Sequence, residues 1–394
     1  MPNDLSHSKP ERPDYSKGFP EGLEIFETLP DPRNGPATRH YFGELLFIAI
    51  ASMLCGMDTC ADFARFAESR KSWLQQWLKL PGGAPCANTF LRLFAAIDPD
   101  SFYQCLREFV LKQLPHLEGK LINIDGKSLR GSRKDDTTMV QMVSAWIAQE
   151  GLTIAQQAVD KKSNEITAVP LLLRQLDLKG AIVSLDAMST QRSIAKEIKD
   201  AEADYLLALK GNQETIHQSV IKAFEQLEII DEVEKSTKTI TGHTTVNKGH
   251  GRIEKRTATV IDSSEWLGKD LISKWPGLRS LVRIESETLM GKGKTRGEAR
   301  YYLSSREPDA EKLLEYTRAH WSIENQCHWV LDVVFDEDGC RARSGNAASN
   351  LSTLRRIVLN ILKLDQRKPK EAIRGKRIHA VLDSSYLEHL MGIS

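Results

Sequence analysis

Two apolar segments of the sequence each end in an aspartate, and this feature restricts the possible folds more than any other. Residues 121–124 precede Asp125, and residues 180–185 precede Asp186. Short apolar runs bounded by turn residues such as Gly126 are typical of buried strands. A buried strand that ends in a carboxylate places that side chain at the edge of its sheet. The two segments therefore predict a carboxylate site to which both strands contribute.

The elements between residues 120 and 210 predict how the two strands are arranged. In order, the sequence predicts the strand ending at Asp125, strands over 139–148 and 152–159, a helix over 166–176, the strand ending at Asp186, a helix over 190–200 and a strand over 204–209. This β-β-β-α-β-α-β order is that of a ribonuclease-H-like sheet, in which the first and fourth strands are parallel neighbours. We therefore expect Asp125 and Asp186 to lie side by side.

The rest of the sequence predicts further segments around this sheet. Residues 1–20 are rich in Pro, Ser, Asp and Lys without periodicity, which is typical of a disordered lead-in. Helical patterns between turn-rich breaks predict an all-α domain over 21–115. The α/β domain is expected over 116–365, with a β-rich insertion at about 215–300, and a basic tail over 366–394. The predicted fold class is thus α/β, with a ribonuclease-H-like core, a β-rich insertion and an N-terminal all-α domain.

The overall charge does not indicate a polyanionic partner, because the formal net charge of the 394 residues is only +1. A hypothesis of DNA binding therefore has to rest on local clusters of basic residues. Basic residues of the insertion, among them Arg252, and those of the tail suit a DNA backbone. Lysines of exposed hairpins also block pairing between strand edges, and basic tails also keep chain ends soluble, so both interpretations stay open.

Cysteine usage and hydropathy favour a soluble cytoplasmic protein. The six cysteines are scattered without a C-x-x-C pair, and the sequence carries no signal peptide. The longest apolar run, residues 45–55, is too short to span a bilayer. We therefore expect reduced thiols and no association with membranes.

A third carboxylate is expected on a helix predicted over residues 313–334. His320, Glu324, His328 and Asp332 recur at four-residue steps there and would form one polar stripe. Glu324 could reach the two aspartates from such a helix. Two histidines with an acid also suit zinc, but about 12 Å of helix separates the histidines, which is too far to share an ion. Histidines that face the helix surface or contact DNA are the preferred interpretation.

Three carboxylates suit a particular chemistry. Magnesium takes oxygen ligands and leaves room for phosphate and water. Two such ions about 3.5–4 Å apart activate an attacking oxygen and stabilise the leaving oxygen in phosphodiester displacement. Three carboxylates are sufficient to hold both ions, with one aspartate shared between them.

Several motifs make the sequence similar to insertion-sequence transposases of the DDE class, in particular to the H-repeat-associated proteins. The segments that carry the resemblance are residues 124–127, 185–187, 205–213, 320–325, 328–333, 336–338 and 341–343, and the likeness extends over residues 23–110. It implies a ribonuclease-H-like core and magnesium-dependent cleavage and strand transfer at transposon ends. Asp125, Asp186 and Glu324 take the positions of the catalytic, metal-binding triad.

The resemblance also implies cofactors and partners. The cofactor would be two Mg²⁺ ions, which Mn²⁺ can replace, and the substrates would be terminal repeats and target DNA. A homodimer is expected in the active complex, because two DNA ends are paired. The predicted DNA contacts are Lys127, Lys210, Asn212, Arg252, His320 and His328.

The sequence departs from many relatives in one respect. The tyrosine, arginine and lysine that surround the glutamate in those proteins are replaced here by Thr317, His320 and Leu331. DNA-end contacts and hairpin chemistry therefore cannot be transferred from them. Two alternative functions stay open, a catalytically silent DNA-binding protein and a metal-dependent nuclease that does not join strands.

Overall fold

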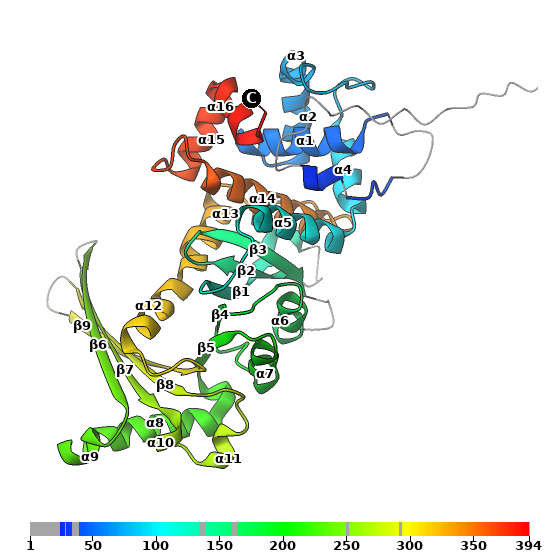
Figure 1. Ribbon diagram of the computed structural model, residues 1–394. Helices are drawn as coiled ribbons and strands as arrows, with labels where there is room; N and C mark the ends of the chain where they lie inside the picture. Colours follow the sequence, from blue (N-terminus) through cyan, green and yellow to red (C-terminus); the bar gives the residue numbers. More distant parts are fainter. Residues whose placement is uncertain are drawn as a thin grey trace, which may run out of the picture.

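The computed structural model describes residues 24–27, 29–33, 39–133, 139–159, 164–249, 252–290 and 294–393 (Figure 1). The predicted lead-in over residues 1–20 lies outside these residues. The strands are β1 (Leu121–Leu129), β2 (Val140–Ile147), β3 (Leu152–Ala158), β4 (Ile182–Leu185), β5 (Asp204–Leu209), β6 (Ile240–Gly249), β7 (Arg252–Asp262), β8 (Ser280–Met290) and β9 (Lys294–Ser304). They form one nine-stranded sheet in the order β3-β2-β1-β4-β5-β9-β8-β7-β6.

The central part of this sheet confirms the predicted strand arrangement. β1 pairs with β2 in antiparallel and with β4 in parallel orientation, and Ile124 lies opposite Leu185. The residues that follow this pair, Asp125 and Asp186, therefore leave the sheet at the same edge. β5 continues the parallel arrangement beyond β4.

The β-rich segment after residue 215 does not stand apart from the core sheet. β9 pairs with β5 in antiparallel orientation, and the meander β6–β9 extends the sheet from there. Figure 1 shows these long strands reaching away from the rest of the molecule. The predicted insertion is thus a continuation of the core sheet through backbone hydrogen bonds.

Helices cover both faces of the sheet. α6 (Glu165–Leu173) contacts β2 and β3, and α7 (Arg192–Asp200) contacts β5 on the same side, whereas α12 (Ala310–His320) lies on the opposite side across β1, β4 and β5 (Figure 1). The other helices between β5 and α14 are α8 (Glu214–Ile229) and the shorter α9 (Glu232–Ser236), α10 (Ser263–Trp266), α11 (Lys269–Ile272) and α13 (Trp329–Val333).

The N-terminal helices share their core with the sheet. They are α1 (Phe42–Leu54), α2 (Cys60–Ser69), α3 (Lys71–Leu74), α4 (Ala87–Ala96) and α5 (Pro99–Gln113). α5 begins where the sequence predicts, because Asp98 accepts a hydrogen bond from the Ser101 amide at 2.9 Å and Pro99 follows it. One continuous set of buried side chains joins these helices to the sheet.

α14 (Ala347–Leu364) is the helix that connects the two parts. Apolar residues at helical spacing, such as Leu351, Leu354 and Ile361, predict an amphipathic helix over residues 348–364, but residues on all sides of α14 are buried. It contacts α1, α4 and α5 as well as β2 and β3. Its buried polar groups are satisfied across these contacts, since Asn350 donates to the Phe94 carbonyl at 2.8 Å and Asn360 donates to the Thr153 carbonyl at 2.8 Å.

The segment predicted as a basic tail, residues 366–394, is largely helical in the structure. This segment forms α15 (Ile373–Leu382) and α16 (Ser384–Met391), which pack near α1 and α14. Lys376 and Arg377 are only 3% and 4% exposed. Lys376 donates to the Leu362 carbonyl at 2.7 Å, and Arg377 donates to the Met53 carbonyl at 3.0 Å. Their charges serve helix packing, because buried cations need such partners.

Candidate metal centre

Asp125 and Asp186 meet at the sheet edge as predicted. Asp125 lies in β1, and Asp186 follows β4 directly, where its carboxylate accepts a hydrogen bond from the Ser189 amide at 3.0 Å. Burial raises the pKa of Asp125. Nearby His328 opposes this rise, whereas the charges of Asp186 and Glu324 add to it. Asp125 is thus close enough to Asp186 and to Glu324 for both charges to act on it.

The predicted helix over residues 313–334 is interrupted. α12 ends at His320, residues Glu324–His328 form a π-helical turn, and α13 follows. Asn123 of β1 promotes this ending, because its side chain donates to the Ala319 and His320 carbonyls at 2.7 and 3.2 Å. π-helical turns recur at functional sites.

The interruption divides the predicted polar stripe into three environments. His320 faces Ser184 of β4, Glu324 and His328 face Asp125, and Asp332 faces Lys127. A regular helix would align all four side chains along one slanting stripe. The altered turn therefore decides which of them reach the aspartates.

Glu324, His328 and Asp125 form a compact group. The His328 Nδ1 lies 3.2 Å from a Glu324 carboxylate oxygen and 3.5 Å from an Asp125 oxygen. One potential ligand atom from each residue lies within 4.8 Å of the others. The side chain of His328 is 5% exposed, and its buried Nε2 has no hydrogen-bond partner among the described residues. This set of donors fits a divalent cation, with carboxylates for Mg²⁺ and an imidazole that Mn²⁺ also accepts.

His320 is a packing residue and is not carried forward as a DNA contact. Its Nδ1 lies 2.8 Å from the Ser184 hydroxyl, which donates to the Asn123 side-chain oxygen at 2.7 Å. Burial lowers the pKa of His320 to about 4, against a smaller opposing effect of Asp186. A neutral imidazole enclosed in this way offers no charge to a phosphate.

The lowered pKa of His320 predicts a loss of stability in mild acid. The unfolded chain binds a proton on this imidazole near pH 6.5, whereas the folded protein binds it only near pH 4. The free energy of unfolding should therefore fall as the pH decreases between these values, by at most about 3 kcal/mol. Urea unfolding across this range should show a flatter profile for His320→Gln. The exposed His116→Gln is the control, and equal profiles in all three proteins would contradict the prediction.

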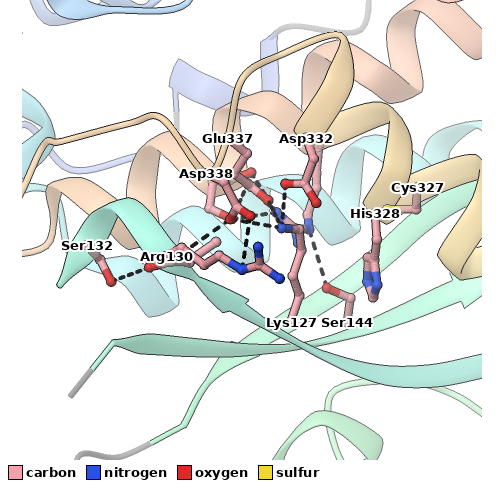
Figure 2. A network of polar contacts seen from close by, with 12 residues as sticks. Lys127, Arg130, Ser132, Ser144, Cys327, His328, Asp332, Glu337 and Asp338 are labelled. Atoms are coloured by element: carbon pink, nitrogen blue, oxygen red, sulfur yellow. Dashed lines mark hydrogen bonds and ion pairs between the residues drawn. The ribbon is translucent and has the colours of Figure 1, made fainter.

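Lys127 lies in a buried ion-pair network (Figure 2). Its ammonium group is 2.6 Å from Asp332, 3.3 Å from Asp338 and 3.7 Å from Glu337. The side chain of Lys127 is 8% exposed. Lys127 is therefore not carried forward as a DNA contact, because its charge already faces three carboxylates. It fixes the segment after the π-helical turn against β1.

The other four predicted DNA contacts lie in different parts of the structure. Asn212 donates to the Ala187 carbonyl at 2.6 Å and so holds the loop that follows Asp186. Lys210 is exposed directly after β5, at the sheet edge where Asp186 lies. Arg252 begins β7, and its side chain lies outside the described part of the structure. His328 faces the carboxylates described above and is not a surface residue.

Sequence reasoning missed one acidic residue near the aspartates. Glu165 is the first residue of α6, and the charges that act on it include those of Asp186 and Asp125. Its position depends on how α6 packs on the sheet, which no motif indicates. The local sequence around Asp125 gives one signal of this position, namely Gly126, because a residue without a side chain leaves room for the Glu165 carboxylate beside the strand.

Comparison with known families agrees with this geometry. The Transposase DDE domain matches residues 117–361, and the domain associated with it matches residues 23–110. The chain belongs to the DDE transposase family. Family membership implies the ribonuclease-H-like fold to which the strand order points, and it implies DNA as the substrate class. The matched region contains Asp125, Glu165, Asp186, Glu324 and His328.

Similar proteins come from Escherichia coli. "Putative transposase YncI" of strain O157:H7 is 34% identical over 376 residues, which cover 94% of each chain. "H repeat-associated putative transposase YhhI" of strain K12 is 34% identical over 377 residues, or 94% of this chain and 97% of that protein. These relatives confirm the resemblance to the H-repeat-associated proteins.

In the described residues, none of the helices combines the length and apolarity needed to cross a membrane.

Proposed function

We propose that this protein cleaves DNA at insertion-sequence ends and joins the cleaved strands to target DNA in a metal-dependent reaction. The observation that supports the proposal is that Asp186 at the end of β4 and Glu324 of the π-helical turn both lie near Asp125 of β1. The side chains lie far apart in sequence, and their mutual repulsion is costly unless cations compensate it.

Each residue has a distinct role in this proposal. Asp125 is near Asp186 as well as near the pair Glu324 and His328, so we propose that it contributes to both of two ion positions. Bound divalent ions would supply activation of the attacking oxygen and stabilisation of the leaving oxygen. His328 contacts Glu324 and Asp125 and orients both carboxylates. Lys210 at the same sheet edge remains a proposed contact to DNA phosphates.

The partners and conditions follow from this chemistry. We propose terminal repeats and target DNA as substrates, Mg²⁺ as the physiological ion and Mn²⁺ as a substitute. A homodimer would pair the two transposon ends during the reaction. We also propose a cytoplasmic location, where such DNA is accessible.

A cleavage and joining assay on labelled terminal-repeat DNA tests the proposal. With Mg²⁺ or Mn²⁺, the wild-type protein should nick the repeat boundary and produce joined strands, and EDTA should abolish both products. Scrambled repeat DNA serves as the control substrate. Cuts without joined strands would indicate a nuclease, and specific binding without any cleavage would indicate a silent DNA-binding protein. Either result would overturn the proposed transposase activity.

A further inference from the structure

Glu165 approaches the metal centre from the opposite face of the sheet. Neighbouring residues of a strand alternate between faces, so Asp125 points toward α12 and Gly126 toward α6. Glu165 is the first residue of α6 and lies over Gly126. Its carboxylate therefore reaches the sheet edge beside the two aspartates from a direction that none of the three predicted acids uses.

Gly126 is needed for this approach. A Cβ atom added at Gly126 would overlap both carboxylate oxygens of Glu165. The backbone of Gly126 is not in the left-handed region that favours glycine, so conformational freedom does not explain this residue. The absent side chain provides the space in which the Glu165 carboxylate lies.

The charges around Glu165 are mostly of the same sign. Burial raises the pKa of Glu165, the charges of Asp186 and Asp125 raise it further, and His328 lowers it. Among the residues that the structure describes, no lysine or arginine contributes to this shift. A partly buried carboxylate beside two others costs free energy unless a cation compensates it.

The surrounding residues provide an independent indication of a cation. The His328 side chain is 5% exposed and aims its Nδ1 into the carboxylate group, while its buried Nε2 has no partner among the described residues. Asp125, Glu324 and His328 offer one compact group of possible ligand atoms, and the charges of Asp125 and Asp186 both act on Glu165 from the α6 side. Four carboxylates match the charge of two divalent ions.

We propose that Glu165 is a fourth carboxylate of the metal centre and supplies an oxygen ligand to the ion held between Asp125 and Asp186. This inference rests on the proposed function, because it assigns a further ligand to the same site. It also gives Gly126 a role, which is to admit that ligand.

Metal binding by the full-length protein tests the inference without requiring DNA. Titration calorimetry with Mn²⁺ gives the number of bound ions and their dissociation constants. For Glu165→Gln, one ion should bind about 10-fold to 100-fold more weakly, and the Mn²⁺-induced rise in melting temperature should shrink accordingly. The control is Glu214→Gln, which changes an exposed glutamate at the same first position of α8 and should bind Mn²⁺ as the wild type does.

A second set of variants tests the steric part of the inference. Gly126→Ala should displace the Glu165 carboxylate and weaken the binding of the same ion to a similar extent. It should lower the melting temperature in the wild type but not in Glu165→Ala, where the added methyl group has room. Additive effects of the two substitutions would contradict a direct contact.

The outcomes separate this inference from the proposed function. If Glu165→Gln binds Mn²⁺ as tightly as Glu214→Gln while Asp125→Asn loses binding, the role of Glu165 is overturned and the proposed function stands. If Asp125→Asn also binds both ions with unchanged affinity, the proposed metal centre itself is overturned.

Discussion

Replacing Asp125 by asparagine is expected to lower metal-dependent strand cleavage by about 1,000-fold or more. Asparagine keeps the shape of the side chain but removes the charge that both proposed ion positions share. Losing several kcal/mol of transition-state stabilisation corresponds to a rate loss of this size. Single-turnover cleavage of labelled terminal-repeat DNA at saturating Mg²⁺ measures the effect.

The same variant should not lose stability in the absence of metal. Burial raises the pKa of Asp125. His328 lowers this pKa, and the charges of Asp186 and Glu324 offset part of that lowering. A carboxyl with a raised pKa costs stability once the pH exceeds its unfolded value of 3.8, and the cost is complete above its folded value. The melting temperature of metal-free Asp125→Asn should therefore equal or exceed that of the wild type.

A matched control distinguishes a specific loss of cleavage activity in Asp125→Asn from the effect of removing any carboxylate charge. Asp200→Asn changes an exposed carboxylate at the end of α7 that pairs with Lys196. This variant should cleave DNA at the wild-type rate. Full activity in Asp125→Asn would rule out the proposed role of Asp125.

The largest loss of stability is expected for Glu337→Gln. The Glu337 side chain is 1% exposed and accepts hydrogen bonds from Arg356 at 3.1 Å and Ser352 at 2.9 Å. The Arg356 side chain is fully buried, and the ammonium group of Lys127 lies 3.7 Å away. Neutralising Glu337 removes the carboxylate partner of the buried Arg356, which typically costs about 3–5 kcal/mol. Urea unfolding at neutral pH measures this difference.

The pH dependence of Glu337→Gln provides a further check. Burial alone would raise the pKa of Glu337, but Arg356, Arg355 and Lys127 together hold it below its ordinary value of 4.5. The stabilisation by this carboxylate is therefore present above pH 4.5 and is lost as the pH falls through the lower folded pKa. The difference between wild type and variant should narrow in that acidic range.

Two variants serve as controls for this prediction. Lys196→Met breaks an exposed ion pair and should change the free energy of unfolding by less than about 1 kcal/mol. Replacing Glu337 and Arg356 together by apolar residues should cost less than the sum of the single changes, because no buried charge is left alone. A loss as small for Glu337→Gln as for Lys196→Met would contradict the buried network.

The ion-pair network connects stability with the metal centre. Lys127 follows Asp125 by two residues in β1, and its partners Asp332, Glu337 and Asp338 follow the π-helical turn that carries Glu324. The network thus ties the strand that bears Asp125 to the segment that bears Glu324. If Asp125 and Glu324 act as proposed, they need such support, because displacements of about 1 Å are costly to catalysis.

The sequence was most informative where local pattern controls structure. Apolar runs, turn residues and element order were sufficient to place β1 beside β4 and to bring Asp125 and Asp186 to one sheet edge, as the strand pairing confirms. The prediction of this strand arrangement succeeds because a strand that is buried on both faces has a recognisable composition. In addition, few topologies satisfy a given order of elements.

Periodicity was less informative for charged and polar residues. It gave no indication that Lys127, Lys376 and Arg377 are buried, and it predicted an amphipathic α14 where neighbours cover every side. A buried cation and a solvated one have the same local sequence pattern. Partners that are distant in the chain decide between them, such as Glu337 for Arg356.

The order of the strands and the two aspartates that end them follow from short-range composition. How Glu324, His328 and Glu165 reach those aspartates depends instead on tertiary contacts. Asn123 of β1 meets the end of α12, the helix gives way to a π-helical turn, and Glu324 and His328 then face Asp125. Glu165 reaches the same group because α6 packs over Gly126. These positions arise from contacts between residues far apart in the chain, and local sequence patterns do not encode such contacts.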